Sequence, residues 1–437
     1  MDAASLNLSG KFWVPHLPHL KEASWVAIGQ LAVAAGGLVA IKVCTNVLGR
    51  AEFGRFSAAL AIAGLGQVCF FGPISQAAMR FLSMATERRI LGAYRSSLLK
   101  LYLIGGLAVV LCWLAAVLGG FNHMLPVPVA LIALYTLASG LQMILLAEIN
   151  AARLRQWVAG LQVADALFRP ALILAVAMLT DHSASQVILS YIVTTLIIVS
   201  VLFGLSAGLR SRELHLSPSP DVKRGHSLYT QMASFTWLFV LFGVLGAVGS
   251  HGERLLLVNF VSWEDVGAYA LMSQLAMAPN LMLTSVINQY YLPMVYQSDP
   301  SGASRLGRSY QYYLLFSIVG IFAVAVSVAV LGRWIIPLFS STAFLGHEHL
   351  LWFLALSAGI FNLGQQLVLP GMRENRLSLY VPAKLLHSLG LLCLAFLLTP
   401  TWGITGMAVA SVVSATVYTL SVIGTNAYLA RSASVPA

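Results

Sequence analysis

Twelve apolar runs of about 20 residues constrain the fold of this chain more than any other feature of its sequence. A helix that crosses a hydrocarbon core about 30 Å thick needs roughly 20 mostly apolar residues. Only helices and closed barrels satisfy their backbone hydrogen bonds in lipid, and runs this long exclude a barrel. The sequence therefore predicts an all-α polytopic membrane protein. The predicted spans are 25–48, 56–79, 99–121, 126–148, 160–180, 186–206, 228–249, 267–293, 310–331, 349–371, 382–399 and 403–428.

The composition agrees with this class, because 59% of the residues are hydrophobic and 9% are charged. The connections between the spans are short, so no extramembrane domain is expected to hold a soluble active site. No Gly-rich phosphate loop, Ser/His/Asp set or pair of catalytic carboxylates is evident. The four cysteines lie in apolar runs without paired spacing, which indicates small core residues. We therefore expect no enzyme activity, no metal and no organic cofactor.

The positive charges predict the orientation of the spans, since cytoplasmic loops carry the Lys and Arg excess. With the N-terminus inside, the cytoplasmic segments hold 18 of the 25 Lys and Arg residues, and the outer loops hold four. Both termini are then cytoplasmic. Topology and anionic lipid explain the net charge of +10, which is not a nucleic-acid footprint.

An internal repeat divides the chain into two halves. The stretch "TNVLGRAEFGRFSAALAIA", 45–63, is echoed at a constant offset by "VNFVSWEDVGAYALMSQLA", 258–276, so that position 45 matches position 258. Because each half has six spans, the halves are predicted to be parallel repeats about an axis along the membrane normal, with a site at their interface. The predicted organisation is an N-terminal segment 1–24, an N-lobe 25–206, a linker 207–227, a C-lobe 228–429 and a tail 430–437.

Three blocks of residues point to a family. They are "TNVLGRAEFGRFSAALAIAGLGQVCFFGPISQAAMRF" at 45–81, "ERLLLVNFVSWEDVGAYALMSQLA" at 253–276 and "WGITGMAVASVVSATVY" at 402–418. They resemble the polysaccharide transporters, or Wzx-type oligosaccharide flippases, of the MOP (multidrug/oligosaccharidyl-lipid/polysaccharide) exporter superfamily. The resemblance covers the whole chain in layout and these three blocks in residues.

The resemblance implies two six-helix lobes around a central cavity in a bacterial inner membrane. Such a protein moves a polyprenyl-pyrophosphate-linked oligosaccharide from the inner to the outer leaflet by alternating access. The implied partners are this lipid-linked substrate, membrane lipids and other glycan assembly proteins. A substrate with two phosphates and many hydroxyls needs cationic anchors and hydrogen-bonding side chains inside the membrane.

Five charged residues are candidates for that cavity. Lys42 lies near the outer end of the first span and either faces the cavity, which we favour, or snorkels to the outer interface. Glu253 and Arg254 follow the seventh span and either extend it or form an ordinary loop pair. Asp165 and Arg169 are four residues apart, so they share a helix face and bind substrate or form a structural pair.

Several polar residues are suited to sugar hydroxyls. These candidates are Asn46, Gln76, Asn259, Asn288, Gln289 and Tyr290. The amides also suit contacts between helices, and an interfacial aromatic belt explains the tyrosine equally well. Three residues, Gly72, Pro73 and Pro279, break backbone bonding in the second and eighth spans and are candidates for bending during gating.

The sequence leaves coupling to H⁺ or Na⁺ open, with Glu148, Asp165 and Glu253 as candidate carboxylates. The main alternative function is a MATE-like ion-coupled multidrug antiporter, which should carry acidic residues in its cavity, whereas the first span offers Lys42. A polysaccharide polymerase or ligase would be expected to have a large outer loop. A flippase for the peptidoglycan lipid precursor would be expected to have two additional helices.

Overall fold

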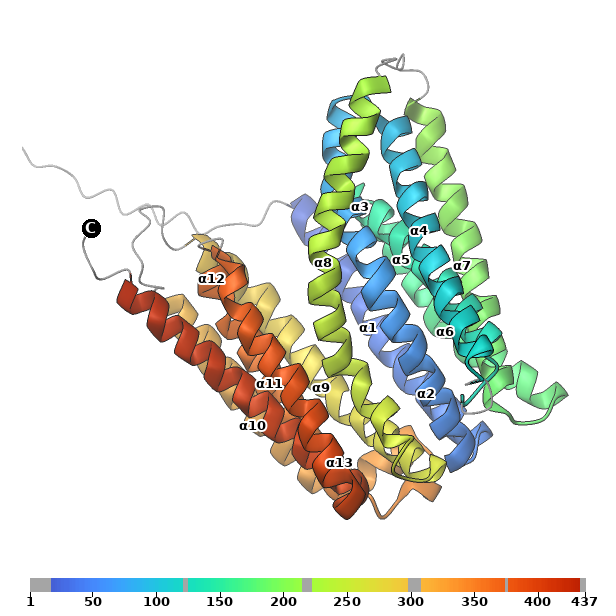
Figure 1. Cartoon of the computed structure of the whole chain (residues 1–437), viewed down its shortest axis with the longest axis vertical. Coiled ribbons are helices and arrows are strands. Elements are labelled where there is room, and N and C mark those ends of the chain that lie inside the picture. The colour runs from blue at the N-terminus through green and yellow to red at the C-terminus, as the bar shows by residue number, and fades with distance from the viewer. Residues whose placement is uncertain (1–16, 121–124, 214–221, 298–307, 374–375, 433–437) are drawn as a thin grey trace, which may run out of the picture.

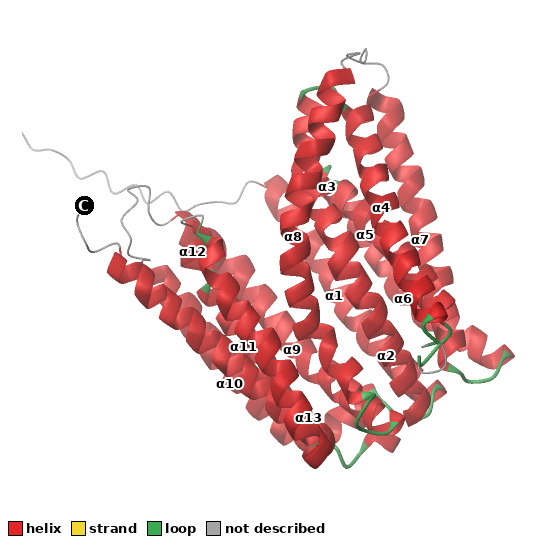
Figure 2. Cartoon of the chain, viewed as in Figure 1, coloured by secondary structure: helices red, strands yellow, loops and turns green. Residues whose placement is uncertain are grey.

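The computed structural model describes residues 17–120, 125–213, 222–297, 308–373 and 376–432, and these are helical almost throughout (Figure 2). The helices are α1 (Leu17–Val47), α2 (Arg50–Gly66), the π-helical turn η1 (Gln67–Phe71), α3 (Gly72–Glu87), α4 (Leu91–Leu118), α5 (Val129–Ala151), α6 (Arg155–Leu179), α7 (Ala184–Glu213), α8 (Val222–Leu257), α9 (Trp263–Gln297), α10 (Arg308–Phe339), the 3₁₀ turn η3 (Thr342–Phe344), α11 (His349–Leu367), α12 (Leu369–Arg373), the 3₁₀ turn η4 (Leu377–Tyr380) and α13 (Val381–Ser432). No strand occurs in the described ranges.

The predicted spans all fall on helices. Among the described residues, ten helices are long and apolar enough to cross a membrane. One of them, Ser378–Arg431, holds the last two predicted spans, which are separated by a break at Gly403 with φ 56° and ψ −139°. Glycine adopts this left-handed backbone without the clash that a Cβ atom would cause. The predicted seventh span lies on α8.

The helices form two bundles arranged as a V (Figure 1). One bundle contains α1 to α7, the N-lobe, and the other contains α9 to α13, the C-lobe. The bundles converge at one end and diverge at the other. We name these the closed end and the open end, and the open end is where α3 ends and α8 begins. The predicted all-α membrane fold with two lobes is confirmed.

Helix α8 contacts both lobes. Leu228 and Met232 in its first half belong to a buried cluster with residues of α3 and α4. The Arg80 guanidinium of α3 lies 4.5 Å from the centre of the Phe235 ring. The second half of α8 packs on α13, where Ser388 donates a hydrogen bond to the Leu245 carbonyl at 2.9 Å. Helix α8 therefore connects the two lobes physically as well as in sequence.

The repeated glycines of the two halves touch each other at the closed end. A Cβ atom on Gly54 of α2 would lie 2.0 Å from the Trp263 carbonyl oxygen, and one on Gly267 of α9 would lie 2.3 Å from the Arg50 carbonyl oxygen. Gly267 matches Gly54 in the repeat, and Trp263 matches Arg50 at the same offset. The contact therefore maps onto itself when the halves are exchanged, as expected for parallel repeats about one axis.

A second matched pair supports the same symmetry. The Gln67 amide of η1 donates a hydrogen bond to Ser139 of α5 at 2.6 Å. Asn280 of α9, which matches Gln67 in the repeat, donates to the Ala355 carbonyl of α11 at 3.0 Å. In each lobe, an amide in the second membrane span thus donates a hydrogen bond to the fourth span, which is α5 in one lobe and α11 in the other.

Polar and aromatic contacts between the lobes hold the closed end together. The Ser341 backbone N–H, after α10, donates to the Thr45 hydroxyl of α1 at 3.2 Å. The Phe53 ring of α2 packs edge-on against the Phe344 ring of η3, with 5.7 Å between centroids. Both phenylalanines are buried. These contacts therefore join the two lobes at the closed end.

Candidate functional site

A largely apolar cavity of about 620 Å³ lies between α1 and α9. Its walls run from Ala27 to Ile41 on α1 and from Gln274 to Val286 on α9. Arg254 of α8 supplies the charge in the described lining. We call it the larger cavity. A cavity of this size and apolar character is typical of small-molecule sites.

Arg254 is a cation that has no hydrogen bond or salt bridge in this cavity, although the neighbouring Glu253 carboxylate attracts its charge. Helix α8 continues through Glu253 and Arg254 to Leu257, so both residues lie in the helix and not in a loop. Among the described residues, the Arg254 guanidinium makes no hydrogen bond and no ion pair. An unpaired charge at an apolar cavity is costly unless an anion or water meets it. Arg254 is therefore available to bind an anionic ligand.

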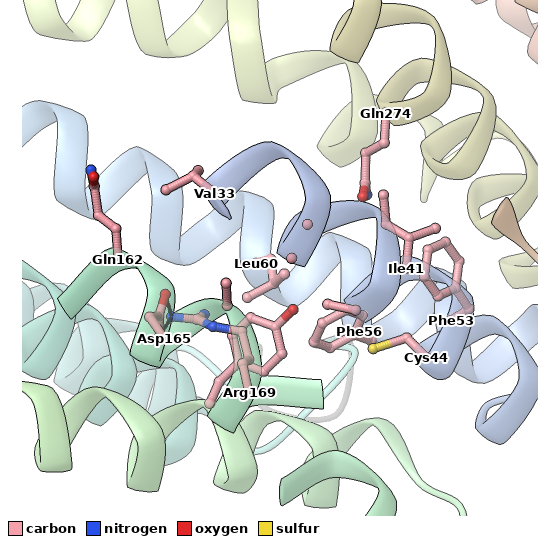
Figure 3. Close-up of a pocket in the computed structure, with 15 residues that line it drawn as sticks. Val33, Ile41, Cys44, Phe53, Phe56, Leu60, Gln162, Asp165, Arg169 and Gln274 are labelled. Atoms are coloured by element: carbon pink, nitrogen blue, oxygen red, sulfur yellow. Dashed lines mark hydrogen bonds and ion pairs between the residues drawn. The ribbon is translucent and has the colours of Figure 1, made fainter. Parts of the chain in front are cut away.

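A smaller cavity of about 330 Å³ lies on the other side of α1 (Figure 3). Helices α1, α2, α6 and α7 line it, and α6 contributes Asp165 and Arg169. The Arg169 guanidinium donates to both Asp165 carboxylate oxygens, at 2.7 and 2.9 Å. It also lies 4.4 Å from the centre of the Tyr191 ring. The predicted pairing on one helix face is therefore present, and the pair borders a cavity.

The two cavities share four lining residues: Val33, Gly37 and Ile41 of α1, and Gln274 of α9. The three α1 residues are spaced four apart and so lie on one helix face. Gln274 comes from the opposite lobe, and Figure 3 shows its amide directed toward α1. Gln274 was not predicted from the sequence. The repeat could have identified it, because the matched position in the first half is the apolar Ala61 and an amide is therefore not needed there for the fold.

Lys42 has a different environment from Arg254. Its ammonium donates hydrogen bonds to the Pro337 carbonyl at 2.6 Å and to the Ser340 carbonyl at 2.7 Å. These carbonyls lie at the C-terminal end of α10, where a cation satisfies unpaired carbonyls and the helix dipole. Lys42 thus binds one lobe to the other, and it lines neither cavity.

The three candidate ion-coupling carboxylates have different partners. Asp165 is paired with Arg169. Glu148 of α5 is buried and lies 3.4 Å from Arg95 of α4. Glu253 accepts hydrogen bonds from two hydroxyls, Tyr269 of α9 at 2.5 Å and Ser411 of α13 at 2.7 Å. A hydroxyl either donates or accepts, so these partners suit a carboxylate and a protonated carboxyl alike.

The predicted polar residues do not gather at the two cavities. Asn46, Gln76 and Asn259 are exposed and line neither of them. Asn288 accepts a hydrogen bond from the Tyr313 hydroxyl at 2.7 Å, within the C-lobe. Gln289 and Tyr290 follow it in α9, and their side chains lie outside the described residues.

The predicted breaks differ from each other. The π-helical turn η1 (Gln67–Phe71) directly precedes Gly72 and Pro73, so the second span contains a change of helix type. Pro279 lies inside α9, which is assigned as one helix from Trp263 to Gln297. Whether either break bends during transport stays a prediction.

The comparison with protein families gives a match over most of the chain. Residues 19–298 match the family described as polysaccharide biosynthesis protein. The chain belongs to this family. The curated proteins compared with it include no match.

Solved structures share the fold of this family member. A lipid II flippase MurJ in an inward closed conformation superposes with a TM-score of 0.69 at 10% identity, covering 93% of this chain and 87% of the other. An inward-facing multidrug resistance MATE family transporter of the MOP superfamily gives a TM-score of 0.63 at 14% identity, covering 95% and 100%. A MOP superfamily transporter from Pyrococcus furiosus, described by a binding pocket of reverse polarity, gives 0.57 at 14% identity, covering 95% and 97%. At these identities the likeness concerns the fold.

Proposed function

We propose that this protein is a flippase that moves a polyprenyl-pyrophosphate-linked oligosaccharide across the bacterial inner membrane by alternating access. The cargo would be a repeat unit of O-antigen, capsule or exopolysaccharide. Membership of the polysaccharide biosynthesis protein family and the fold shared with a lipid II flippase support this function. The role requires no catalytic residue, and other glycan assembly proteins would supply and consume the cargo.

The single observation that carries the proposal is Arg254, a cation without a salt bridge in a largely apolar cavity. The cargo combines an anionic pyrophosphate with a long hydrocarbon chain. A guanidinium binds phosphate oxygens through two parallel hydrogen bonds, and the apolar walls accommodate the adjoining hydrocarbon. A cationic drug would instead meet like charge there, since no carboxylate is in the described lining of the larger cavity. This contrast disfavours the multidrug alternative.

The positive-inside rule supports an inward-facing assignment for this conformation. The turn between α3 and α4, at the open end, contains Arg88 and Arg89. Such charges favour the cytoplasmic side. The cavity would then receive cargo from the inner leaflet, with both termini cytoplasmic.

Coupling to H⁺ or Na⁺ stays part of the proposal, with Glu253 as the first carboxylate to examine. Its hydrogen-bond partners in the described part of the chain are hydroxyls, with Arg254 as a nearby charge, whereas Asp165 and Glu148 form salt bridges with arginines. Among the three candidates, Glu253 is therefore the one whose carboxylate forms no salt bridge among the described residues.

Binding to purified protein tests the role of Arg254. The probe is a short-chain polyprenyl pyrophosphate that carries a disaccharide, and the protein is reconstituted in lipid nanodiscs. We expect Arg254→Ala to weaken binding by about tenfold to a hundredfold, because charged hydrogen bonds contribute about 1.5–3 kcal/mol each. Arg254→Lys should restore part of the affinity. Arg333→Ala, at an exposed position on α10, is the matched control. Equal affinities for wild type and Arg254→Ala would refute the proposed anchor.

A further inference from the structure

Gln274 lies where the two cavities meet. It comes from α9 and lines both the larger cavity, with Arg254, and the smaller cavity, with Asp165 and Arg169. On α1, Gly37 lies at the same junction, and a Cβ atom placed there would have no atom within 4 Å. The backbone of α1 thus leaves space beside the Gln274 amide. The two cavities therefore adjoin each other at Gly37 and Gln274.

The Gln274 amide has no protein partner at this junction. Within the described residues it makes no hydrogen bond, although an amide carries two donors and an acceptor. The residue is half-buried inside a membrane-spanning helix. A polar group with unmet hydrogen bonds in such a place costs free energy unless water or a ligand meets it. Amides elsewhere in α9 differ, since Asn280 donates to two backbone carbonyls.

The repeat shows that the fold does not require an amide here. The position matched to Gln274 in the N-lobe is Ala61, which is fully buried. The position matched to Arg254 is Ile41. The N-lobe therefore builds the same helices with apolar residues at both places. The second half of the chain differs from the first at Arg254 and Gln274, two polar residues of the larger cavity that make no hydrogen bond among the described residues.

The smaller cavity has the chemistry of a sugar site. Asp165, Arg169 and Gln162 line it on one helix, and the Tyr191 ring completes the wall. Carboxylate, guanidinium and amide groups bind hydroxyls, and the Tyr191 ring supports the Arg169 guanidinium that lies over it. The cavity of about 330 Å³ is about half the size of the larger one. It suits a compact polar group more than a hydrocarbon chain.

We propose that Gln274 hydrogen-bonds the sugar that is attached directly to the pyrophosphate and so determines which glycans are accepted. The pyrophosphate binds Arg254 in the larger cavity, and the first sugar enters the smaller cavity past Gly37. This assignment rests on the proposed function and adds the sugar-reading residue to it. A site built to hydrogen-bond a hydroxyl or amide rejects ligands that lack it, because its own polar group is then left unpaired.

Two probes that differ by one sugar test the assignment. One is a short-chain polyprenyl pyrophosphate, and the other is the same lipid with one N-acetylhexosamine on the terminal phosphate. Binding of each is measured on protein in nanodiscs. We expect Gln274→Leu to weaken binding of the sugar-bearing lipid about five- to tenfold and to leave the sugar-free lipid within about twofold, as for loss of one or two neutral hydrogen bonds.

A second variant reports on the junction without altering the amide. Gly37→Val places a side chain in the open space between the cavities and should likewise weaken only the sugar-bearing lipid. Gln142→Leu on α5 and Gly204→Ala on α7 are matched controls outside both cavities, and neither should change either affinity.

The outcomes separate the two proposals. Equal loss for both probes in Gln274→Leu, or no loss for either, overturns the assignment while leaving the proposed function intact. A wild-type protein that binds the two probes equally overturns it as well. A wild-type protein that binds neither lipid overturns the proposed function itself.

Discussion

Lys42 and Arg254 differ in their hydrogen-bond partners. Lys42 donates to two carbonyls of α10, whereas the Arg254 guanidinium has no hydrogen bond among the described residues. A cation that satisfies a helix C-terminus stabilises the arrangement of the helices it joins. An unpaired one is available to a ligand. In the proposed function, the same charge would hold the lobes together at Lys42 and would bind the cargo at Arg254.

We expect Lys42→Met to open the closed end. Methionine keeps much of the side-chain volume but removes two charge-assisted hydrogen bonds, which favours separation of the lobes by about 1–3 kcal/mol. Spin labels at Gly49→Cys and Leu345→Cys, on opposite lobes in a cysteine-free background, report the distance across this end. The distribution should shift to longer distances, and Arg333→Met, at an exposed position on α10, should not move it. An unchanged distribution in Lys42→Met would show that the contact does not hold the lobes.

The sequence predicted some of these residues and missed others for identifiable reasons. Lys42 was predicted to face the cavity, but it lines neither cavity, and its partners Pro337 and Ser340 lie in the other half of the chain, where no local pattern encodes such a contact. Gln274 escaped notice because a single amide in an apolar helix gives no periodic signal. Its meaning appears only when Ala61 is set beside it and both cavities are known.

At the level of elements, the second span shows how a break accommodates a neighbour. The turn η1 (Gln67–Phe71) places the Val68 carbonyl where a Cβ atom on Gly243 of α8 would lie 2.6 Å from it. A π-helical turn leaves backbone groups displaced from the regular helix and often occurs at functional positions. The sequence predicted a break at Gly72 and Pro73, and the observed break begins earlier, at Gln67.

The contact between α2 and α9 yields a test of the closed end. A methyl group on Gly54 or on Gly267 cannot fit against the facing backbone, so Gly54→Ala and Gly267→Ala should each separate the helices and favour the open arrangement. The double variant should add little to either single one, since both methyl groups enter the same contact.

The label pair at Gly49 and Leu345 reports this change as well. Gly204→Ala, at an exposed glycine of α7 with no atom within 4 Å of a Cβ, controls for the general effect of alanine in a helix. Additive shifts in the double variant, or none in either single variant, would contradict a direct glycine contact.

Helix positions were predicted better than helix contacts. The thickness of the bilayer fixes the length of an apolar span, so hydropathy locates each helix. Contacts between helices depend on small residues and on which faces meet, and apolar composition carries little of this information. The glycine match at 54 and 267 revealed the repeat, but only the structure shows that the matched glycines touch.

For the molecule as a whole, two related lobes are joined at one end and separated at the other. The contact between the matched residues Gly54 and Gly267 lies at the closed end, so an axis that relates the repeats would pass through this contact. Parallel repeats of this kind allow one lobe to rock against the other around a central site. In our account, the chamber between them binds an anionic lipid headgroup and presents it to either side in turn.

Transbilayer movement tests this central claim most directly. Vesicles containing the purified protein are loaded with a short-chain polyprenyl-pyrophosphate disaccharide that carries a fluorophore on its sugar, and a membrane-impermeant reductant added outside quenches the exposed molecules. The account predicts that wild-type protein makes the whole pool accessible over time and that Arg254→Ala slows this by about tenfold or more, as for loss of one charged anchor. A wild-type protein that leaves the inner-leaflet pool protected, or that moves a neutral lipid of the same chain length equally fast, would contradict it.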